Sequence, residues 1–229
     1  MTLHVSNLTT DTPADPQGLS VSTAVTRQSA YQMFFKRAFD LTLVLISLPF
    51  ILPLILFLAL AIALTGNAPF YTQLRVGQGG SAFRMWKLRT MVKNADQHLE
   101  AYLQKNPEAR AEWDSTQKLK NDPRITLFGR LLRKTSIDEL PQLFNVLNGT
   151  MSLVGPRPMM VGQEKYYHGR AYYEMRPGIT GLWQVSERND CAFQDRVNFD
   201  NEYGRVISLK TDLRCLLQTV GVVCRATGH

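Results

Sequence analysis

The sequence has few cysteines, and they lack the spacing that metal sites or disulfide frameworks use. Its three cysteines, Cys191, Cys215 and Cys224, are an odd number and include no tight pair of the kind that binds zinc. Glycine-rich runs with P-loop or dinucleotide spacing are absent, as are the known nucleic-acid-binding motifs. We therefore expect reduced thiols in a cytosolic domain, no zinc site and no nucleic-acid partner.

Residues 1–30 lack the basic start and apolar core of a secretory signal. They are rich in Thr, Ser, Pro and Asp, a composition that does not support a packed core. This segment is expected to be a disordered cytosolic tail.

The run from Leu41 to Leu64 contains no charged residue. As a straight helix it would be roughly 36 Å long, enough to cross a hydrocarbon core of about 30 Å. Cations nevertheless flank it on both sides, and basic flanks tend to stay in the cytoplasm. They are Lys36 and Arg37 before it, and Arg75, Arg84, Lys87, Arg89 and Lys93 after it. Because Pro53 in the middle of the run offers a place to turn, a re-entrant dip is favoured over a spanning helix.

The formal net charge of +7 indicates an anionic partner. Beside an apolar segment, lipid head groups and phosphorylated ligands are better candidates than nucleic acid. We therefore expect membrane lipid and a phosphate compound among the partners.

Beyond the apolar run, the pattern predicts short elements separated by turns. Two strands are expected on either side of the glycine-rich turn at residues 76–80, which is read as a hairpin in preference to a phosphate cradle. The further expectations are a helical stretch over 94–118 interrupted near Pro107, an amphipathic stretch over 125–132, a helix ending at 148–149, and an amphipathic helix over 207–225. The pattern does not decide whether that last helix packs on the core or lies on the membrane.

Asp138 and Glu139 are adjacent carboxylates in a chain dominated by cations. One interpretation is structural, because Ser136 and Glu139 match a capping box, although Pro141 fits better if Asp138 is the cap. The other is chemical: one carboxylate attacks phosphorus while its neighbour holds a divalent cation. Nearby arginines in Pro- or Gly-rich stretches favour a phosphate site. These are Arg133, Arg157, Arg176 and Arg188.

Several blocks in order resemble the bacterial sugar transferases, the monotopic polyprenyl-phosphate phosphoglycosyl transferases. The resemblance runs from about Phe35 to the C-terminus. The matching blocks are residues 36–40, 71–77, 87–91, 122–126, 136–147, 151–158 and 176–189. The chain looks most like members that transfer galactose-1-phosphate to undecaprenyl phosphate in exopolysaccharide or O-antigen assembly.

The resemblance implies an α+β, mainly helical fold with a re-entrant membrane helix, a small β-hairpin and a helical cytosolic catalytic domain. The expected boundaries are a tail over 1–30, an interfacial and re-entrant helix over 31–66, and the catalytic domain over 67–229. The family breaks its membrane helix at a Ser-Pro pair, and here Leu52 stands where some members have the Ser before Pro53. The implied location is the bacterial inner membrane, with the catalytic domain on the cytoplasmic face.

The resemblance also implies a reaction in which Asp138 attacks the β-phosphate of a UDP-sugar, UMP leaves, and polyprenyl phosphate takes the phosphosugar. Glu139, with Asp138 beside it, would hold Mg²⁺. The arginines named above are carried over as phosphate ligands, joined by Lys87, Arg89 and Arg124.

Three questions stay open at this stage. Glucose-1-phosphate could be transferred instead of galactose-1-phosphate, and the same residues would suit a membrane-surface diphosphate hydrolase. A non-enzymatic adaptor that binds anionic lipid is a further alternative. Phe50 and Phe57 could face lipid or a second copy, so a homo-oligomer is left open.

Overall fold

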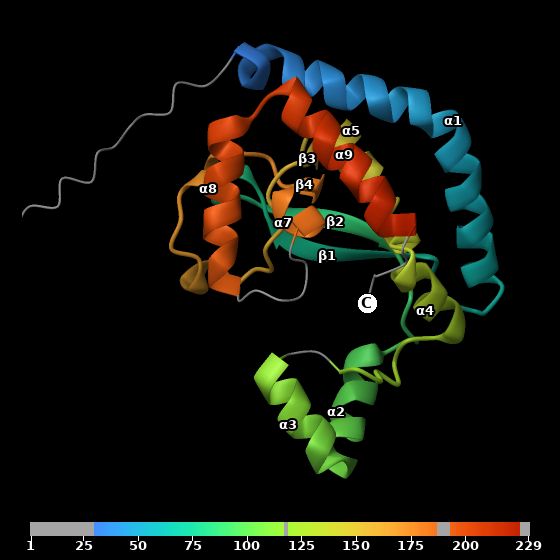
Figure 1. Ribbon diagram of the computed structural model, residues 1–229. Coiled ribbons are helices and arrows are strands. Elements are labelled where there is room, and N and C mark those ends of the chain that lie inside the picture. The colour runs from blue at the N-terminus through green and yellow to red at the C-terminus, as the bar shows by residue number, and fades with distance from the viewer. Residues whose placement is uncertain (1–29, 117–118, 187–192, 225–229) are drawn as a thin grey trace, which may run out of the picture.

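The computed structural model describes residues 30–116, 119–186 and 193–224, and helices dominate it (Figure 1). The N-terminal elements are η1 (Tyr31–Phe35), α1 (Lys36–Ala63), β1 (Phe70–Val76), η2 (Gln78–Gly80), β2 (Ala82–Leu88), α2 (Ala95–Lys105) and α3 (Pro107–Thr116). The middle elements are α4 (Leu127–Lys134), η3 (Ile137–Glu139), α5 (Gln142–Leu147), β3 (Ser152–Val154) and η4 (Glu164–Tyr166). The chain continues with α6 (Ala171–Glu174), β4 (Gly178–Thr180), α7 (Leu182–Ser186), η5 (Phe193–Asp195), α8 (Arg196–Val206) and α9 (Leu209–Cys224).

The apolar run forms α1, which stays helical through Pro49 and Pro53 and bends between its two halves (Figure 1). The predicted break at Pro53 is thus a bend in a continuous helix. Proline removes one intrahelical hydrogen bond, and Pro49 leaves the carbonyl of Leu45 without its usual donor. The Ser47 hydroxyl donates to the preceding carbonyl, that of Val44, over 2.9 Å. A side-chain hydroxyl donor therefore lies beside the turn that Pro49 weakens.

The stretch Tyr31–Ala63 is long and apolar enough to cross a membrane, and only 22% of its most apolar window is buried in the protein. Large side chains near its middle are exposed, including Ile46, Phe50 and Phe57. A helix that is apolar but largely uncovered by protein is suited to a lipid environment.

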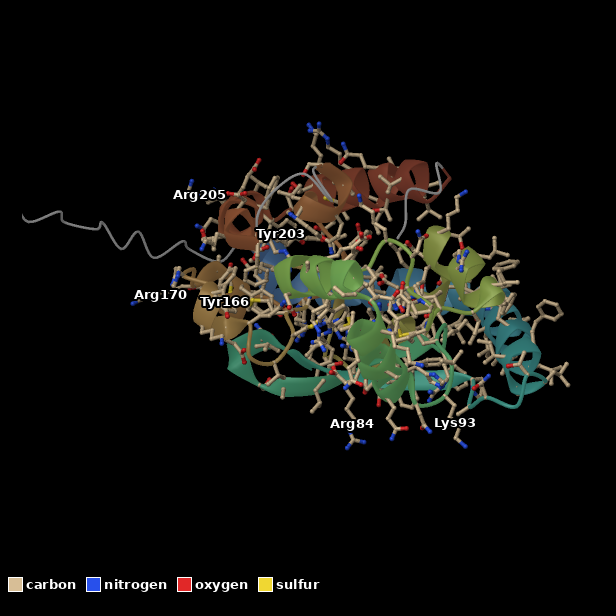
Figure 2. All side chains as sticks on the ribbon, turned by 90° about the horizontal axis from the view of Figure 1, so that it is seen from below. Arg84, Lys93, Tyr166, Arg170, Tyr203 and Arg205 are labelled. Carbon is tan, nitrogen blue, oxygen red and sulfur yellow. The ribbon has the colours of Figure 1, made fainter. Side chains whose placement is uncertain are left out.

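The predicted hairpin is confirmed, with β1 and β2 pairing antiparallel from Phe70 opposite Leu88 to Val76 opposite Ala82. The turn needs glycine, because Gly79 and Gly80 have positive φ values of 69° and 80°. The residues of β2 alternate between the body and solvent. Figure 2 shows Arg84 pointing outward from the hairpin.

Two of the Pro- and Gly-rich stretches that carry predicted phosphate-binding arginines adjoin a second, parallel sheet. Residues 152–154 of β3 pair with residues 178–180 of β4. The two backbones approach so closely that a Cβ at Gly178 would lie 2.1 Å from the backbone nitrogen of Gly155. Glycine at this position therefore allows the arginine-bearing segments to lie side by side.

The other predicted helices are confirmed within one or a few residues. The expected stretch over 94–118 forms α2 and α3, with the chain interrupted just before Pro107. On α9, Asp212 and Cys215 are buried, whereas Leu213, Leu217 and Val220 are exposed. This helix packs on the core with one face and leaves an apolar face uncovered.

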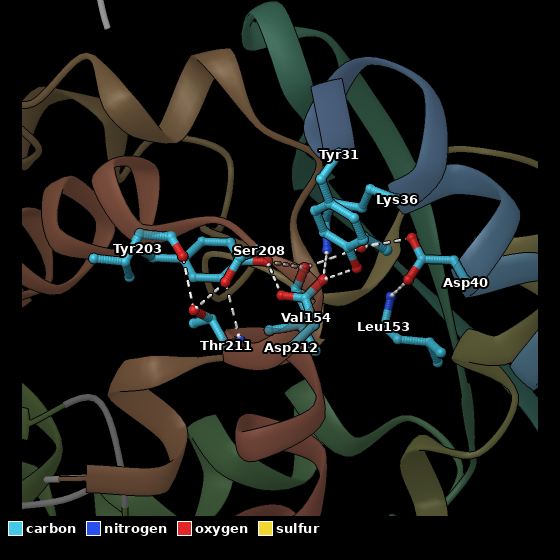
Figure 3. Close-up of polar contacts among 11 residues, drawn as sticks. Tyr31, Lys36, Asp40, Leu153, Val154, Tyr203, Ser208, Thr211 and Asp212 are labelled. Carbon is cyan, nitrogen blue, oxygen red and sulfur yellow. Dashed lines mark hydrogen bonds and ion pairs between the residues drawn. The ribbon is translucent and has the colours of Figure 1, made fainter. Parts of the chain in front are cut away.

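The start of α1 is joined to the rest of the protein by a buried polar cluster (Figure 3). Asp40 accepts hydrogen bonds from the Ser152 hydroxyl at 2.7 Å and from the Leu153 backbone at 3.2 Å. Asp212 of α9, which is fully buried, accepts from Lys36 and Tyr203 at 2.7 Å each. Since each carboxylate is held by several donors, the cluster fixes α1 against β3, α8 and α9.

The other end of α1 packs on a different part of the same body. Leu58, Ala59 and Ile62 form an apolar cluster with Leu88 of β2 and Leu132 of α4. Both ends of α1 therefore rest on the protein, while its middle exposes large apolar side chains.

Candidate active site

The carboxylate pair lies in η3, a short 3₁₀ turn between α4 and α5. Ser136 precedes it in the left-handed region, with φ of 55°, so the chain reverses before the dyad. Its side chain makes no capping hydrogen bond within the described part of the chain, and Pro141 occupies the N-cap of α5. The capping-box interpretation is therefore wrong. Neither carboxylate caps α5, whose N-cap is Pro141.

Glu139 forms an ion pair with Lys87 of β2, with 2.7 Å between Oε1 and Nζ. Asn145 of α5, the helix that follows the dyad, holds α5 in place against β2. Its Oδ1 accepts from the Trp86 backbone N–H at 2.9 Å, and its Nδ2 donates to the Arg84 carbonyl at 2.8 Å. This buried amide positions the lysine beside the dyad, a role that the sequence did not reveal.

Asp138 is buried, and burial raises the pKa of its carboxyl to about 6. The Lys87 ammonium and Arg133 guanidinium act in the opposite direction, while the neighbouring Glu139 raises the pKa further. At neutral pH the carboxylate is ionised but poorly solvated. A desolvated carboxylate is a better nucleophile than a hydrated one, which suits attack on phosphorus.

Arg133, one of the predicted phosphate ligands, lies near Asp138. Its Nε donates to the Thr90 hydroxyl at 2.8 Å, which orients the guanidinium at the end of α4. Burial lowers the pKa of Arg133, and the nearby charge of Asp138 offsets part of that effect. The guanidinium therefore stands close to the Asp138 carboxylate.

Arg75 also belongs to this site, although it was not predicted as a site residue. Its Nε is buried and has no hydrogen-bond partner among the described residues, while its Nη1 donates to the Pro158 carbonyl at 3.2 Å. Burial is the main cause that lowers the pKa of Arg75 to about 10. The charge of Arg157 adds to this shift, and the charge of Glu139 opposes it. The only sequence signal was its place in one of the matching blocks, at residues 71–77.

Arg157 is held differently, over the face of an aromatic ring. Its guanidinium carbon lies 5.5 Å from the centre of the Trp183 ring. Arg196 lies over the same indole at 4.4 Å. Stacking orients a planar guanidinium while leaving its edge available to an anion.

The remaining predicted cations have other partners or lie elsewhere. Arg124 forms a buried bidentate ion pair with Asp122, with nitrogen–oxygen distances of 2.6 to 3.1 Å. Burial alone would raise the pKa of the Asp122 carboxyl, but the hydrogen bonds from Arg124 lower it. Arg89 donates to the Ala68 carbonyl. Arg176 lies near enough to Arg37 for their charges to repel. Arg188 lies outside the described residues.

The dyad fits the way in which proteins commonly bind magnesium. No cluster of three or more metal-ligating side chains occurs among the described residues. Mg²⁺ usually keeps several waters and binds through one or two carboxylates plus substrate phosphates. Asp138 and Glu139 could supply two such carboxylates, and the surrounding cations would bind the substrate phosphates.

Comparisons with known proteins identify the family of this chain. Residues 31–226 match the family described as bacterial sugar transferase. The chain is 46% identical over 212 residues to a UDP-galactose-lipid carrier transferase of Erwinia amylovora, covering 92% of this chain and 44% of that protein. It is 47% identical to an undecaprenyl-phosphate galactose phosphotransferase of Salmonella typhimurium, covering 85% of this chain and 41% of that protein.

The chain thus spans less than half the length of these two relatives. The exopolysaccharide production protein ExoY of Rhizobium meliloti is closer in length, being 43% identical with 84% of this chain and 87% of that protein covered. The family match includes α1, the hairpin and the carboxylate pair. The protein belongs to the bacterial sugar transferase family.

Proposed function

We propose that the protein transfers a hexose-1-phosphate from a UDP-sugar to undecaprenyl phosphate and releases UMP. The observation that carries this proposal is the buried nucleophile Asp138, with its pKa raised to about 6, beside the Glu139–Lys87 ion pair. The names of the relatives supply the substrates, since they include UDP-galactose and undecaprenyl phosphate.

In the first step, a carboxylate oxygen of Asp138 attacks the β-phosphorus of the donor. The bond from that phosphorus to the bridging oxygen breaks, UMP leaves with the electron pair, and the sugar phosphate remains on the carboxylate. Arg133, Arg75 and Arg157 would bind the phosphate oxygens and offset the developing charge.

In the second step, a phosphate oxygen of undecaprenyl phosphate attacks the same phosphorus. The acyl–phosphate bond breaks and Asp138 returns as a free carboxylate, so neither step needs a further reactant. Mg²⁺ held by Glu139 and Asp138 with the donor phosphates would offset phosphate charge. Chelation with EDTA is accordingly expected to abolish turnover, and added Mg²⁺ to restore it.

We also propose that α1 dips into the inner membrane from the cytoplasmic side without crossing it. Its start is bound to Ser152 and Asp212, its end packs on Leu88 and Leu132, and its middle exposes residues such as Phe50. One folded body cannot occupy both faces of a bilayer, so these contacts support a re-entrant path. Tags on Met1 and His229 should report the same face, and opposite faces would refute the dip.

Galactose is the favoured hexose. The relatives named for galactose transfer are 46% and 47% identical, whereas one named UDP-glucose:undecaprenyl-phosphate glucose-1-phosphate transferase, from Caulobacter vibrioides, is 39% identical. The two sugars differ in the configuration of one hydroxyl, so a direct substrate comparison is needed.

The test is UMP release by the protein in nanodiscs with Mg²⁺, using UDP-galactose or UDP-glucose, each with and without undecaprenyl phosphate. We expect sustained release that requires the lipid and is faster with UDP-galactose. Equal sustained release without lipid would indicate a hydrolase. Preference for UDP-glucose would reassign the sugar, and no release with either would exclude both donors.

A further inference from the structure

A cavity of about 180 Å³ adjoins the dyad between η3, α5, β4, α7 and α9. Glu139 is part of its lining. Most of the other lining residues are aliphatic, among them Leu140, Val185 and Val222. The cavity therefore offers an apolar space next to the reacting groups.

Gln184 of α7 also lines this cavity, and it is 5% exposed. Neither its Nε2 nor its Oε1 has a hydrogen-bond partner among the described residues. A buried amide without partners is unfavourable, and native proteins rarely keep one unless something else satisfies it. Because one atom donates and the other accepts, the missing partner should present an acceptor and a donor side by side.

We propose that this cavity is the base-binding subsite and that Gln184 recognises the uracil of the UDP-sugar donor, an inference that rests on the proposed function. Uracil has an imide edge on which an N–H stands between two carbonyl oxygens. The N–H would donate to the Gln184 Oε1, and an adjacent carbonyl would accept from Nε2. This is the bidentate amide–base geometry by which Asn and Gln recognise nucleobases.

The aliphatic lining would cover the two faces of a flat ring. An isoprenoid chain would also suit aliphatic walls, but it would leave both polar atoms of Gln184 unpaired. The buried amide therefore favours the nucleotide over the lipid as the occupant.

The position of α7 agrees with this assignment. Trp183, the residue before Gln184, carries Arg157 over its ring at 5.5 Å. One short helix thus holds the base-reading amide and orients a guanidinium for phosphate. A nucleotide could place its base at Gln184 and its diphosphate between Arg157 and the dyad.

The test measures UMP binding by calorimetry to the full chain in nanodiscs, for the wild type and for Gln184→Met. Methionine keeps the length of the side chain and removes both hydrogen-bonding atoms. We expect the Kd for UMP to rise about 10- to 100-fold and the KM for undecaprenyl phosphate to stay within about twofold. Thermal unfolding checks that the variant is folded.

A second pair of variants tests the cavity without touching the amide. Val222→Phe fills the cavity from α9, whereas Val220→Phe makes the same change on a side chain that is 61% exposed. We expect Val222→Phe to weaken UMP binding at least about tenfold and Val220→Phe to leave it unchanged. This pair still decides the question if Gln184→Met does not fold.

The outcomes separate this inference from the proposed function. UMP affinity that is unchanged in both Gln184→Met and Val222→Phe would overturn the uracil subsite, even if the wild type shows lipid-dependent UMP release. A raised KM for undecaprenyl phosphate with unchanged UMP affinity would assign the cavity to the lipid and also overturn it. Failure of the wild type to turn over would count against the function, whereas calorimetry would still measure the base site.

Discussion

Replacing Asp138 by Asn should remove activity and at the same time stabilise the fold. The carboxyl is 7% exposed, and its burial is the largest cause of its raised pKa. The cations of Lys87 and Arg133 only partly compensate. The ionised Asp138 carboxylate therefore lowers the free energy of unfolding, a cost that a neutral side chain of nearly the same shape avoids.

The size of the effect follows from the pKa of Asp138, which rises from 3.8 to about 6. At about 1.4 kcal/mol for each tenfold change in the ionisation constant, the ionised carboxyl costs up to about 3 kcal/mol at pH 7. The folded state holds the proton more tightly than the unfolded state. Stability is therefore greatest below the unfolded pKa of 3.8, falls as the pH rises to about 6, and then stays level.

The assay is thermal unfolding in nanodiscs with EDTA, so that no divalent cation binds the carboxylate. Asp138→Asn should raise the melting temperature at pH 7.5 by up to about 10 °C, and the gain should shrink as the pH is lowered toward 4. Asp114, which is exposed on α3, serves as the control, since Asp114→Asn should change little.

A variant that is less stable than the wild type at pH 7.5 would refute this account. It would mean that the contacts of the Asp138 carboxylate outweigh its loss of hydration. Activity gives an independent check: Asp138→Asn should release no UMP, and full turnover would exclude the covalent mechanism.

Further predictions concern the groups around the dyad and the anchor of α1. Because it removes a cation 2.7 Å from the dyad, Lys87→Met should lower kcat/KM about a hundredfold, whereas Arg84→Met on the outer side of β2 should leave it within twofold. Asn145→Ala leaves the Trp86 N–H without its acceptor and should lower the free energy of unfolding, measured by chemical denaturation, by about 1–3 kcal/mol. An unchanged free energy would refute the positioning role of Asn145. Asp212→Ala leaves the buried Lys36 ammonium unpaired and should lower the free energy of unfolding by about 3–5 kcal/mol. A decrease below about 1 kcal/mol would contradict the role of Asp212 in holding the start of α1. If the Asp138 carboxyl must be ionised to attack, kcat/KM should fall about tenfold per pH unit below about pH 6. A flat pH profile down to pH 4.5 would argue against attack by Asp138.

Local patterns were reliable wherever neighbouring residues decide the structure. The glycine-rich turn at residues 76–80 predicted the hairpin, because Gly79 and Gly80 adopt positive φ values that other residues disfavour. The interruption near Pro107 and the end of α5 at Asn148 followed from the same kind of short-range chemistry. The capping box failed because Ser136 takes a left-handed conformation, which a motif of residue types does not encode.

The sequence by itself determined the apolar helix, the hairpin, the cationic surplus and the adjacent carboxylates, since each depends on composition or short-range spacing. Only the tertiary structure decided which cation joins the dyad, because Lys87 and Glu139 lie 52 residues apart. It also buried Gln184 without a hydrogen-bond partner among the described residues. Burial and pairing depend on how distant segments pack, and packing sets both the pKa of Asp138 and the chemistry open to it.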